Sequence, residues 1–348
     1  MDYRTLGRTG VKVSPLCLGA MMFGAWGNTD HAECHRIIRQ ALDAGINFID
    51  TADVYSAGES EQIVGHFLAD AGPAVREEVV LATKFHGQMG AGPNEQGNSR
   101  RWVIAECEAS LRRLRTDHID LYQIHRPSPE VDIDETLGAL SDLVHAGKVR
   151  YFGSSTFPAW MVVEAHWASE RRGRERLATE QPPYSMLARG IEADLLEVCQ
   201  RYGMGVLPWS PLGGGWLSGR FGTGKDNTSR RSERIPARYD MSAPGNAAKL
   251  VAVDQLSELA DKAGYTLPEM AVAFVINHPA VTSAIIGPRT MDHLTGVLGA
   301  VDIRLDNAIL DRIDEIVPPG ADLNIDDHGW VPPWVGEPQL RRRVTASS

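Results

Sequence analysis

Four polar side chains follow three successive apolar runs of the chain, and their types suit proton transfer. Asp50 ends the run FID and Tyr55 follows five residues later, while Lys84 ends VVLATK and His125 ends IDLYQIH. A lysine ammonium about 4 Å from a phenolate attracts it by about 4 kcal/mol at an effective dielectric of about 20, so Lys84 could help Tyr55 to release its proton. Asp50 would hold the ammonium in place, and His125 would orient a carbonyl group or assist proton movement.

Each of these residues also has an ordinary explanation. Asp50 could cap a strand end, Tyr55 could pack within a loop, and Lys84 could be a solvated charge. His125 could simply form a hydrogen bond at a strand end. Taken singly, these explanations are the more common ones, but four such residues after three neighbouring runs favour a shared acid–base site. Adjacent parallel strands lie about 4.8 Å apart, which would bring the four groups within reach of one another.

The elements that would position this site are short apolar runs that alternate with amphipathic segments. The predicted strands are Ser14–Leu18, Phe48–Asp50, Val79–Thr83, Ile119–Ile124, Val149–Gly153, Ala178–Gln181, Gly205–Trp209 and Ser283–Ile286. The predicted helices span 32–44, 59–70, 100–115, 134–146, 158–171, 190–202, 246–263 and 290–299. Repeated strand–helix units predict an α/β fold, a single (β/α)8 TIM barrel over residues 1–348, with its active site at the carboxyl ends of the strands.

Further segments lie outside these repeats. A β-hairpin is predicted over 3–13, and an extra helix over 306–317. The segment from Leu212 to Ala243 follows the seventh strand and is rich in Gly, Ser and Arg, so we expect a ligand clamp there. The tail, 318–348, contains Trp330 and Trp334, and we expect its first part to fold over the barrel and its last eight residues to fray.

Composition excludes several classes of function. Lys and Arg number 35 against 45 Asp and Glu, a formal charge of -10, so the chain has no overall cationic field for nucleic acid. No C-x-x-C or H-x-H pair is present, and we therefore expect no metal site. The absence of a signal peptide and of any apolar run near 20 residues predicts a cytoplasmic protein with no membrane partner. The cysteines are then expected to be reduced thiols: Cys17, Cys34, Cys107 and Cys199.

The motifs together resemble the aldo-keto reductase superfamily. They are D-T-A-x-x-Y at 50–55, T-K at 83–84, D-x-x-x-x-H at 120–125, G-S-S at 153–155 and W-S-P-L-G at 209–213. The opening Y-R-x-L-G-x-T-G-x-x-V-S and the segment L-G-A-M-M-F-G look closest to bacterial and potassium-channel β-subunit-like branches. The resemblance implies a catalytic tetrad of Asp50, Tyr55, Lys84 and His125. It also implies reduction of an aldehyde or ketone by hydride transfer from NADPH, with Tyr55 as general acid.

The resemblance further implies a cofactor that lies extended across the barrel mouth, since no G-x-G-x-x-G motif follows a strand. Its carboxamide would contact Ser154, Ser155 and Gln181, and its nicotinamide ring would stack on Trp209. The remaining implied contacts are Gly19, Ala20, Met21, Asp50, Ser210, Leu212, Gly214, Arg220, Gly287, Arg289 and His293. Arg289 would pair with a 2′-phosphate and favour NADPH, with NADH as a less preferred cofactor. Arg230, Arg231 and Arg234 could supplement this phosphate site.

The substrate would be a small carbonyl compound. Candidate contacts are Met22, Phe23, Trp26, Tyr55, Phe85, His86 and His125, with Trp330 reaching in from the tail. Two other barrel enzymes are weaker explanations: a Schiff-base aldolase with Lys84 as nucleophile, and a metal-dependent hydrolase. A stronger alternative is a cofactor-sensing regulatory subunit with little turnover, and a homo-oligomer is compatible with either role.

Overall fold

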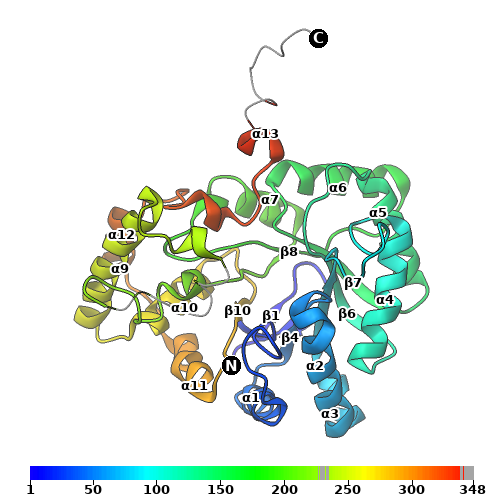
Figure 1. Cartoon of the computed structure of the whole chain (residues 1–348), viewed down its shortest axis with the longest axis horizontal. Coiled ribbons are helices and arrows are strands. Elements are labelled where there is room, and N and C mark those ends of the chain that lie inside the picture. The colour runs from blue at the N-terminus through cyan, green and yellow to red at the C-terminus, as the bar shows by residue number, and fades with distance from the viewer. Residues whose placement is uncertain (226, 228–231, 233–234, 338–339, 341–348) are drawn as a thin grey trace.

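The molecule is built on one curled sheet of parallel strands (Figure 1). In the computed structural model, which describes residues 1–225, 227, 232, 235–337 and 340, eight strands follow one another in the order β10-β3-β4-β5-β6-β7-β8-β9. They are β3 (Leu16–Gly19), β4 (Phe48–Asp50), β5 (Val80–Phe85), β6 (Ile119–Ile124), β7 (Val149–Ser155), β8 (Thr179–Gln181), β9 (Gly205–Val206) and β10 (Ala284–Ile286). Parallel bridges from Val206 to Val281 and from Trp209 to Ile285 join the two edges. The prediction of a (β/α)8 barrel is confirmed.

Helices cover the outside of the sheet. They are α1 (His31–Asp43), α2 (Glu59–Ala71), α3 (Pro73–Glu78), α4 (Arg100–Leu114), α5 (Ile133–His145), α6 (Ala159–Arg172), α7 (Leu195–Tyr202), α9 (Pro244–Ala263), α10 (Leu267–Asn277), α11 (Met291–Leu298), α12 (Asn307–Ile316) and α13 (Pro333–Gly336). Several of these helices are capped at their N-terminus by a side chain that accepts a hydrogen bond from a backbone N–H of the first turn. Asp30 caps α1 in this way and Ser99 caps α4. Thr266 and Glu269 form a reciprocal capping box at the start of α10.

Two separate sets of apolar side chains make up the core. One fills the barrel and includes Phe48, Ala82 and Leu121, while the other packs between the strands and the helices. Because successive strand residues point to opposite faces, the residues two positions further along these strands also point into the barrel. This alternation decides which strand-end side chains reach the barrel mouth.

The largest difference from the sequence prediction is α10, which was missed. Its sequence LPEMAVAFVIN is apolar on nearly every side, and eight of its eleven residues are buried, so it lacks an amphipathic period. The helix predicted over 246–263 is α9, which lies outside and packs against α10 and α12. The helix predicted over 190–202 is divided into the 3-10 turn Gly190–Glu192 and α7. β9 is shorter than predicted because Pro182, which follows β8, has no N–H to pair with Leu207; pairing resumes at Trp209, whose N–H donates to the carbonyl oxygen of Pro182 at 2.9 Å.

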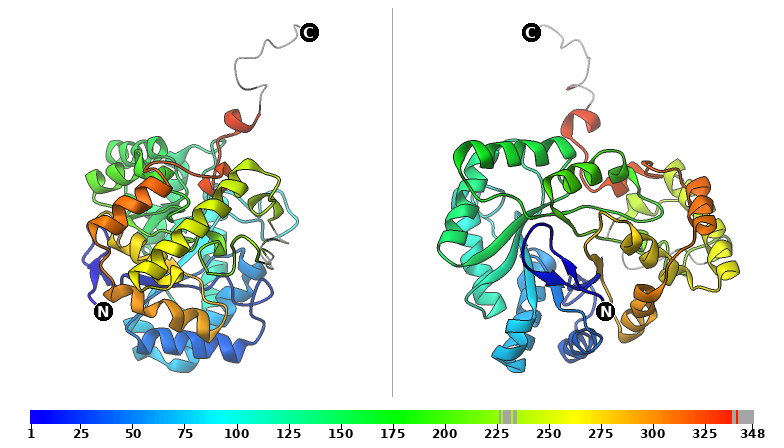
Figure 2. Two further views of the ribbon diagram at one scale, coloured as in Figure 1. Left: turned by 90° about the vertical axis from the view of Figure 1, so that its left-hand side faces the viewer. Right: turned by 180° about the vertical axis from the view of Figure 1, so that it is seen from behind.

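The hairpin predicted over 3–13 is present as β1 (Arg4–Thr5) and β2 (Lys12–Val13), which pair antiparallel. Leu6 and Val13 belong to the set of side chains that fills the barrel. Figure 2 shows the hairpin in dark blue, most clearly from behind. The hairpin therefore closes the end of the barrel opposite the mouth.

The tail folds back along the barrel, as the sequence predicted. Ala188 pairs with Asp322, and Asp327 accepts hydrogen bonds from Arg238 Nε at 2.6 Å and from Lys249 Nζ at 2.8 Å. Gly329 lies against Thr156 and Trp209 at the mouth. The last eight residues, expected to fray, lie outside the described part of the chain.

The segment from Leu212 to Ala243 is anchored by aromatic side chains where it is described. Trp216 stacks on Phe221, with ring centroids 4.7 Å apart, and on Tyr239, at 5.9 Å. The Tyr239 hydroxyl donates to the carbonyl oxygen of Gly214 at 2.7 Å. Arg230, Arg231 and Arg234 lie outside the described residues. In the described part of the chain, no helix has the length and apolar character needed to cross a membrane.

Candidate active site

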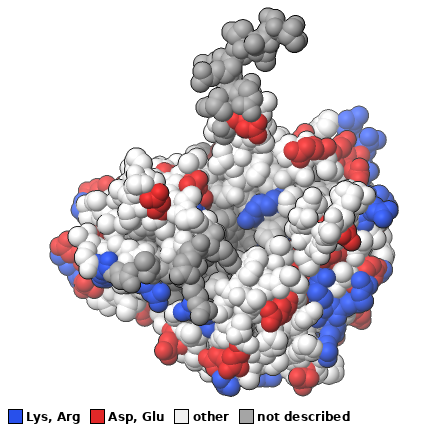
Figure 3. All heavy atoms as spheres, in the orientation of Figure 1, with Lys and Arg blue, Asp and Glu red and all other residues white. Residues whose placement is uncertain are grey.

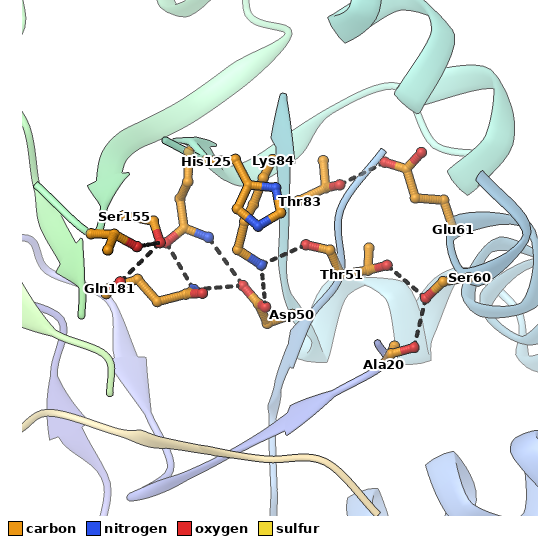
Figure 4. Close-up of polar contacts among 12 residues, drawn as sticks. Ala20, Asp50, Thr51, Ser60, Glu61, Thr83, Lys84, His125, Ser155 and Gln181 are labelled. Atoms are coloured by element: carbon orange, nitrogen blue, oxygen red, sulfur yellow. Dashed lines mark hydrogen bonds and ion pairs between the residues drawn. The ribbon is translucent and has the colours of Figure 1, made fainter. Parts of the chain in front are cut away.

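A buried polar row crosses the top of the barrel (Figure 4). Asp50, at the end of β4, and Lys84, near the end of β5, form an ion pair in which both side chains are buried. Lys84 Nζ also donates to the carbonyl oxygen of Thr51 at 2.8 Å. The second oxygen of Asp50 accepts from the amides of Gln123 at 3.0 Å and Gln181 at 2.9 Å. Both oxygens of this carboxylate therefore have hydrogen-bond partners, as a buried charge requires.

Tyr55 lies above this row on the 3-10 turn Tyr55–Gly58. Ser56 and Ala57 have φ angles of 50° and 55°, which side chains rarely adopt, so the turn is strained. Ser56 Oγ accepts from the backbone N–H of Trp26 at 3.0 Å and holds the turn against the loop that follows β3. The Tyr55 ring centroid lies 5.1 Å from Lys84 Nζ and 5.6 Å from the His125 ring centroid. The structure thus brings all four predicted acid–base residues together.

The charges in this group are set by burial and by the Asp50–Lys84 pair. Burial alone would lower the pKa of Lys84, but the charge of Asp50, together with contacts to Asp50 and Tyr55, raises that pKa overall. The pKa of His125 is well below its ordinary value because the ring is buried and because the charges of Arg126 and Lys84 lie nearby. Figure 4 shows the His125 ring beside Lys84. Lys84 is therefore a cation and His125 a neutral imidazole at physiological pH.

A second buried charged group supports the Tyr55 turn from the helix-facing side of β5. Thr83 Oγ1 donates to Glu61 at 2.6 Å, and Arg113 Nε lies 2.5 Å from the other oxygen of Glu61. Arg113 also pairs with Glu106. Burial, followed by the charges of Glu61 and Glu106, raises the pKa of Asp53 well above its ordinary value. This network joins β5, α2 and α4 beneath the turn that carries Tyr55.

The ends of β7 to β9 form the other half of the mouth. Ser155 Oγ donates to the carbonyl oxygen of Gln181 at 2.9 Å, and Thr156 follows with a φ of 63°. Trp209 packs on the top of the side chains that fill the barrel, and its Nε1 is buried without a partner among the described residues. The Trp209 indole therefore offers a flat ring at the top of the barrel and a buried N–H that still needs an acceptor. Both features fit a ligand with a flat ring and polar edges.

The residues predicted to contact the cofactor phosphates lie near one another. Burial lowers the pKa of His293, and the charges of Arg289 and Arg220 lower it further, so the three side chains lie within electrostatic range. Gly213–Gly215 have positive φ angles of 58°, 74° and 108°, which glycine adopts readily. Because glycine has no side chain, the peptide groups of this segment are open to a ligand. Asn28 Nδ2 donates to the carbonyl oxygen of Arg289 at 2.9 Å. The arrangement can hold anionic groups.

Some predicted contacts lie elsewhere. Ser154 points toward the helices and donates to Glu180, while Phe85 and Phe23 are buried in the outer core, where Phe85 packs on Tyr122. Strand alternation explains this, since Lys84 and Ser155 occupy the inward positions next to Phe85 and Ser154. Partly exposed candidates around the mouth are Met21, Met22, Trp26, His86, Ser210, Leu212, Gly214 and Trp330. Gly19 and Ala20 are buried at the end of β3, and Gly287 is exposed after β10.

Sequence reasoning missed three residues of the mouth. Gln123 contacts both Asp50 and Gln181, and its position two residues after the inward-facing Leu121 could have identified it. Arg126 and Thr156 join each other across the ends of β6 and β7 at 3.0 Å, but no strand alternation fixes side chains in such loops. Among the described residues, no group of three or more His, Cys, Asp and Glu side chains could hold a metal ion.

Comparisons with known proteins agree with this geometry. The model of the Aldo/keto reductase family matches residues 15–318. An uncharacterized oxidoreductase, YrpG, of Bacillus subtilis is 40% identical over 331 residues, covering 92% of this chain and 98% of that protein. A probable voltage-gated potassium channel subunit beta of Arabidopsis thaliana is 34% identical, covering 91% and 97%. Norsolorinic acid reductase B of Dothistroma septosporum is 34% identical, covering 91% and 82%.

Proposed function

Because the chain belongs to the Aldo/keto reductase family, we propose that it reduces an aldehyde or ketone to an alcohol with NADPH, and that Tyr55 is the general acid. The observation that carries this proposal is the buried Asp50–Lys84 pair beside the Tyr55 and His125 rings. That arrangement supplies a proton donor, a fixed cation and a neutral imidazole on one side of an open mouth.

The residues of the chain would divide the proton chemistry among them. The substrate oxygen would accept hydrogen bonds from Tyr55 and from neutral His125, which fix its position. As the carbonyl carbon gains a hydride, Tyr55 gives its proton to the oxygen and becomes a phenolate. The Lys84 ammonium stabilises that phenolate, and Asp50 keeps Lys84 charged despite its burial.

When bound, the nicotinamide cofactor would supply the hydride. The residues present fit such a molecule: Trp209 would take the nicotinamide ring, and Gln181 and Ser155 would take its carboxamide. Arg220 and Arg289 would hold its phosphates, which supports NADPH over NADH, since a guanidinium pairs well with a 2′-phosphate.

The direct test is oxidation of NADPH on addition of 4-nitrobenzaldehyde. Tyr55→Phe should lower kcat by a factor of about 10² to 10⁴, the usual contribution of a general acid, and should leave the Kd for NADPH within a few-fold of the parent value. Tyr122→Phe is the matched control, because the Tyr122 hydroxyl is buried on the helix-facing side of β6 and donates to the carbonyl oxygen of Val103 at 3.5 Å. Full turnover by Tyr55→Phe would refute the assignment.

A cofactor-sensing regulatory subunit is the second candidate. It is supported by the relatives from Arabidopsis thaliana and Oryza sativa, each named a probable voltage-gated potassium channel subunit beta. That role predicts tight binding of NADPH with negligible turnover of reactive aldehydes. The same assay therefore separates the two functions.

A further inference from the structure

Arg126 lies at the rim of the mouth, directly after His125. Its Nη1 donates to the carbonyl oxygen of His125 at 2.6 Å and to Thr156 Oγ1 at 3.0 Å, which fixes the guanidinium between the ends of β6 and β7. In the described part of the chain, Nε and Nη2 have no hydrogen-bond partner. The N–H groups of Nε and Nη2 are therefore available to bind a ligand.

The charge of Arg126 acts on the same groups that surround the proposed reaction. It lowers the pKa of His125 and that of His86, after burial as the larger cause in each. Burial lowers the pKa of Arg126 itself, while the phenol of Tyr55 and the carboxyl of Glu180 oppose that change. The guanidinium is therefore within electrostatic range of Tyr55, His86 and His125.

Two other cations near His125 and Trp209, Lys84 and Arg238, have carboxylate partners, and Arg126 does not. Lys84 pairs with Asp50, and Arg238 pairs with Asp327 at 2.5 Å. No carboxylate of a described residue lies within ion-pair distance of Arg126. Glu180 does not fill this role, because its oxygens accept from Ser154 and from the backbone N–H of Phe157.

Figure 3 shows the mouth as a hollow in the centre of this face, with basic atoms inside it. A partly buried cation without a counter-ion is costly, and an anionic ligand that enters the hollow removes that cost. The planar fork of a guanidinium suits a carboxylate in particular, since two parallel N–H groups can bind both of its oxygens.

We propose that Arg126 determines substrate specificity by binding a carboxylate carried by the substrate, so that the preferred class is aldehydes or ketones with a second, anionic carboxyl group. This inference rests on the proposed function. The backbone link to His125 would hold the carboxylate at a fixed distance from the carbonyl that His125 and Tyr55 bind, so Arg126 selects and orients the substrate and takes no part in proton transfer.

The experiment compares 4-carboxybenzaldehyde with its methyl ester, because the two share the same ring and aldehyde and differ in charge. The measured quantity is the ratio of kcat/KM for the acid to kcat/KM for the ester. Arg126→Met should lower this ratio by a factor of about 10 to 100, as expected for the loss of a charge-assisted contact. Arg126→Lys should restore part of it. Arg150→Met, which removes an exposed arginine from the opposite end of β7, should leave the ratio unchanged.

Binding gives a readout that does not depend on turnover. In the presence of NADP⁺, the parent chain should bind 4-(hydroxymethyl)benzoate in calorimetry, and Arg126→Met should weaken that binding by a similar factor. If the parent chain turns over neither aldehyde but binds this acid through Arg126, the proposed function fails and the carboxylate site stands. An equal loss for acid and ester, or binding of the acid that does not change in Arg126→Met, would overturn the inference.

Discussion

Replacing Asp50 by asparagine tests the electrostatics on which the site depends. Asp50 accepts from Lys84 through one oxygen and from Gln123 and Gln181 through the other. In Asp50→Asn, the new amide must point its N–H groups either at the Lys84 ammonium or at the two glutamine amides. Donors then face donors in a buried site, and in either orientation Lys84 loses the negative charge of Asp50 while it keeps the carbonyl oxygen of Thr51 as a partner.

The cost follows from the burial of Lys84, whose side chain is 0% exposed. Removing one partner of a buried ion pair costs about 3–5 kcal/mol, because the remaining charge is uncompensated. In the parent chain the pKa of Lys84 is raised above the unfolded value of about 10.4, so its contribution to stability is fully present below pH 10 and is lost as pH rises through the folded value. Between pH 6 and pH 9 that contribution is constant.

In Asp50→Asn the opposite slope is expected. With the carboxylate gone, burial lowers the pKa of Lys84, so the unfolded chain binds more protons than the folded chain up to about pH 10.4. The free energy of unfolding should then rise with pH, by at most about 1.4 kcal/mol per pH unit. Aldehyde reduction should also be slower than in the parent chain, since a neutral lysine does not stabilise a phenolate.

Urea unfolding at pH 6, 7, 8 and 9 measures this slope as the difference between Asp50→Asn and the parent chain. The double variant Asp50→Asn/Lys84→Met is the control, because it removes both charges. The free energy of unfolding of the double variant should not show this dependence on pH. Near pH 7 the double variant should be more stable than the summed losses of Asp50→Asn and Lys84→Met predict. A stability loss that is constant from pH 6 to pH 9, or additive single losses, would show that Lys84 is not held charged by Asp50.

Two further outcomes are expected. Arg289→Ala should weaken the binding of NADPH by about 1.5–3 kcal/mol while leaving that of NADH within a few-fold, as measured by fluorescence titration with both cofactors; equal losses would assign Arg289 a structural role. Burial raises the pKa of Glu180 to about 7, so between the unfolded value of about 4.3 and pH 7 the folded chain binds the extra proton and stability falls as pH rises. Glu180→Gln should flatten that fall, and an unchanged urea-unfolding profile from pH 5 to pH 8 would contradict the role of this carboxyl.

The fold could be predicted from the sequence where the local pattern and the tertiary environment agree. Strands such as Phe48–Asp50 and Ile119–Ile124 coincide with their predictions because short apolar runs end at polar residues. α10 could not be found in this way, because a helix that is buried on nearly every side carries no polar stripe to mark its period. The bounds of β9 depend on its pairing with β8, which is interrupted at Pro182, and this pairing is seen only in the folded barrel.

The convergence of Asp50, Tyr55, Lys84 and His125 could be predicted because all four follow neighbouring strands, whose carboxyl ends meet at the mouth. Predicting which neighbouring side chains reach the mouth also requires knowing the face of the sheet to which each side chain points. Ser154 and Ser155 are equivalent in type, but only Ser155 lies on the inward face, while Ser154 binds Glu180 behind the sheet. The position of Thr156 depends on its left-handed backbone, with a φ of 63°, and a threonine in the sequence does not predict that conformation.

The interior of a barrel is a costly place for a charged pair, and this cost explains the composition of the polar row. Asp50 and Lys84 are both withdrawn from water, so each needs hydrogen bonds beyond the pair itself. Gln123 and Gln181 supply them to Asp50 and bond to each other at 3.1 Å, which joins β4, β6 and β8 across the barrel. Because the two amides and Lys84 share Asp50 as an acceptor, the row acts as one network, and the cation beneath Tyr55 is linked through Asp50 to β4, β6 and β8.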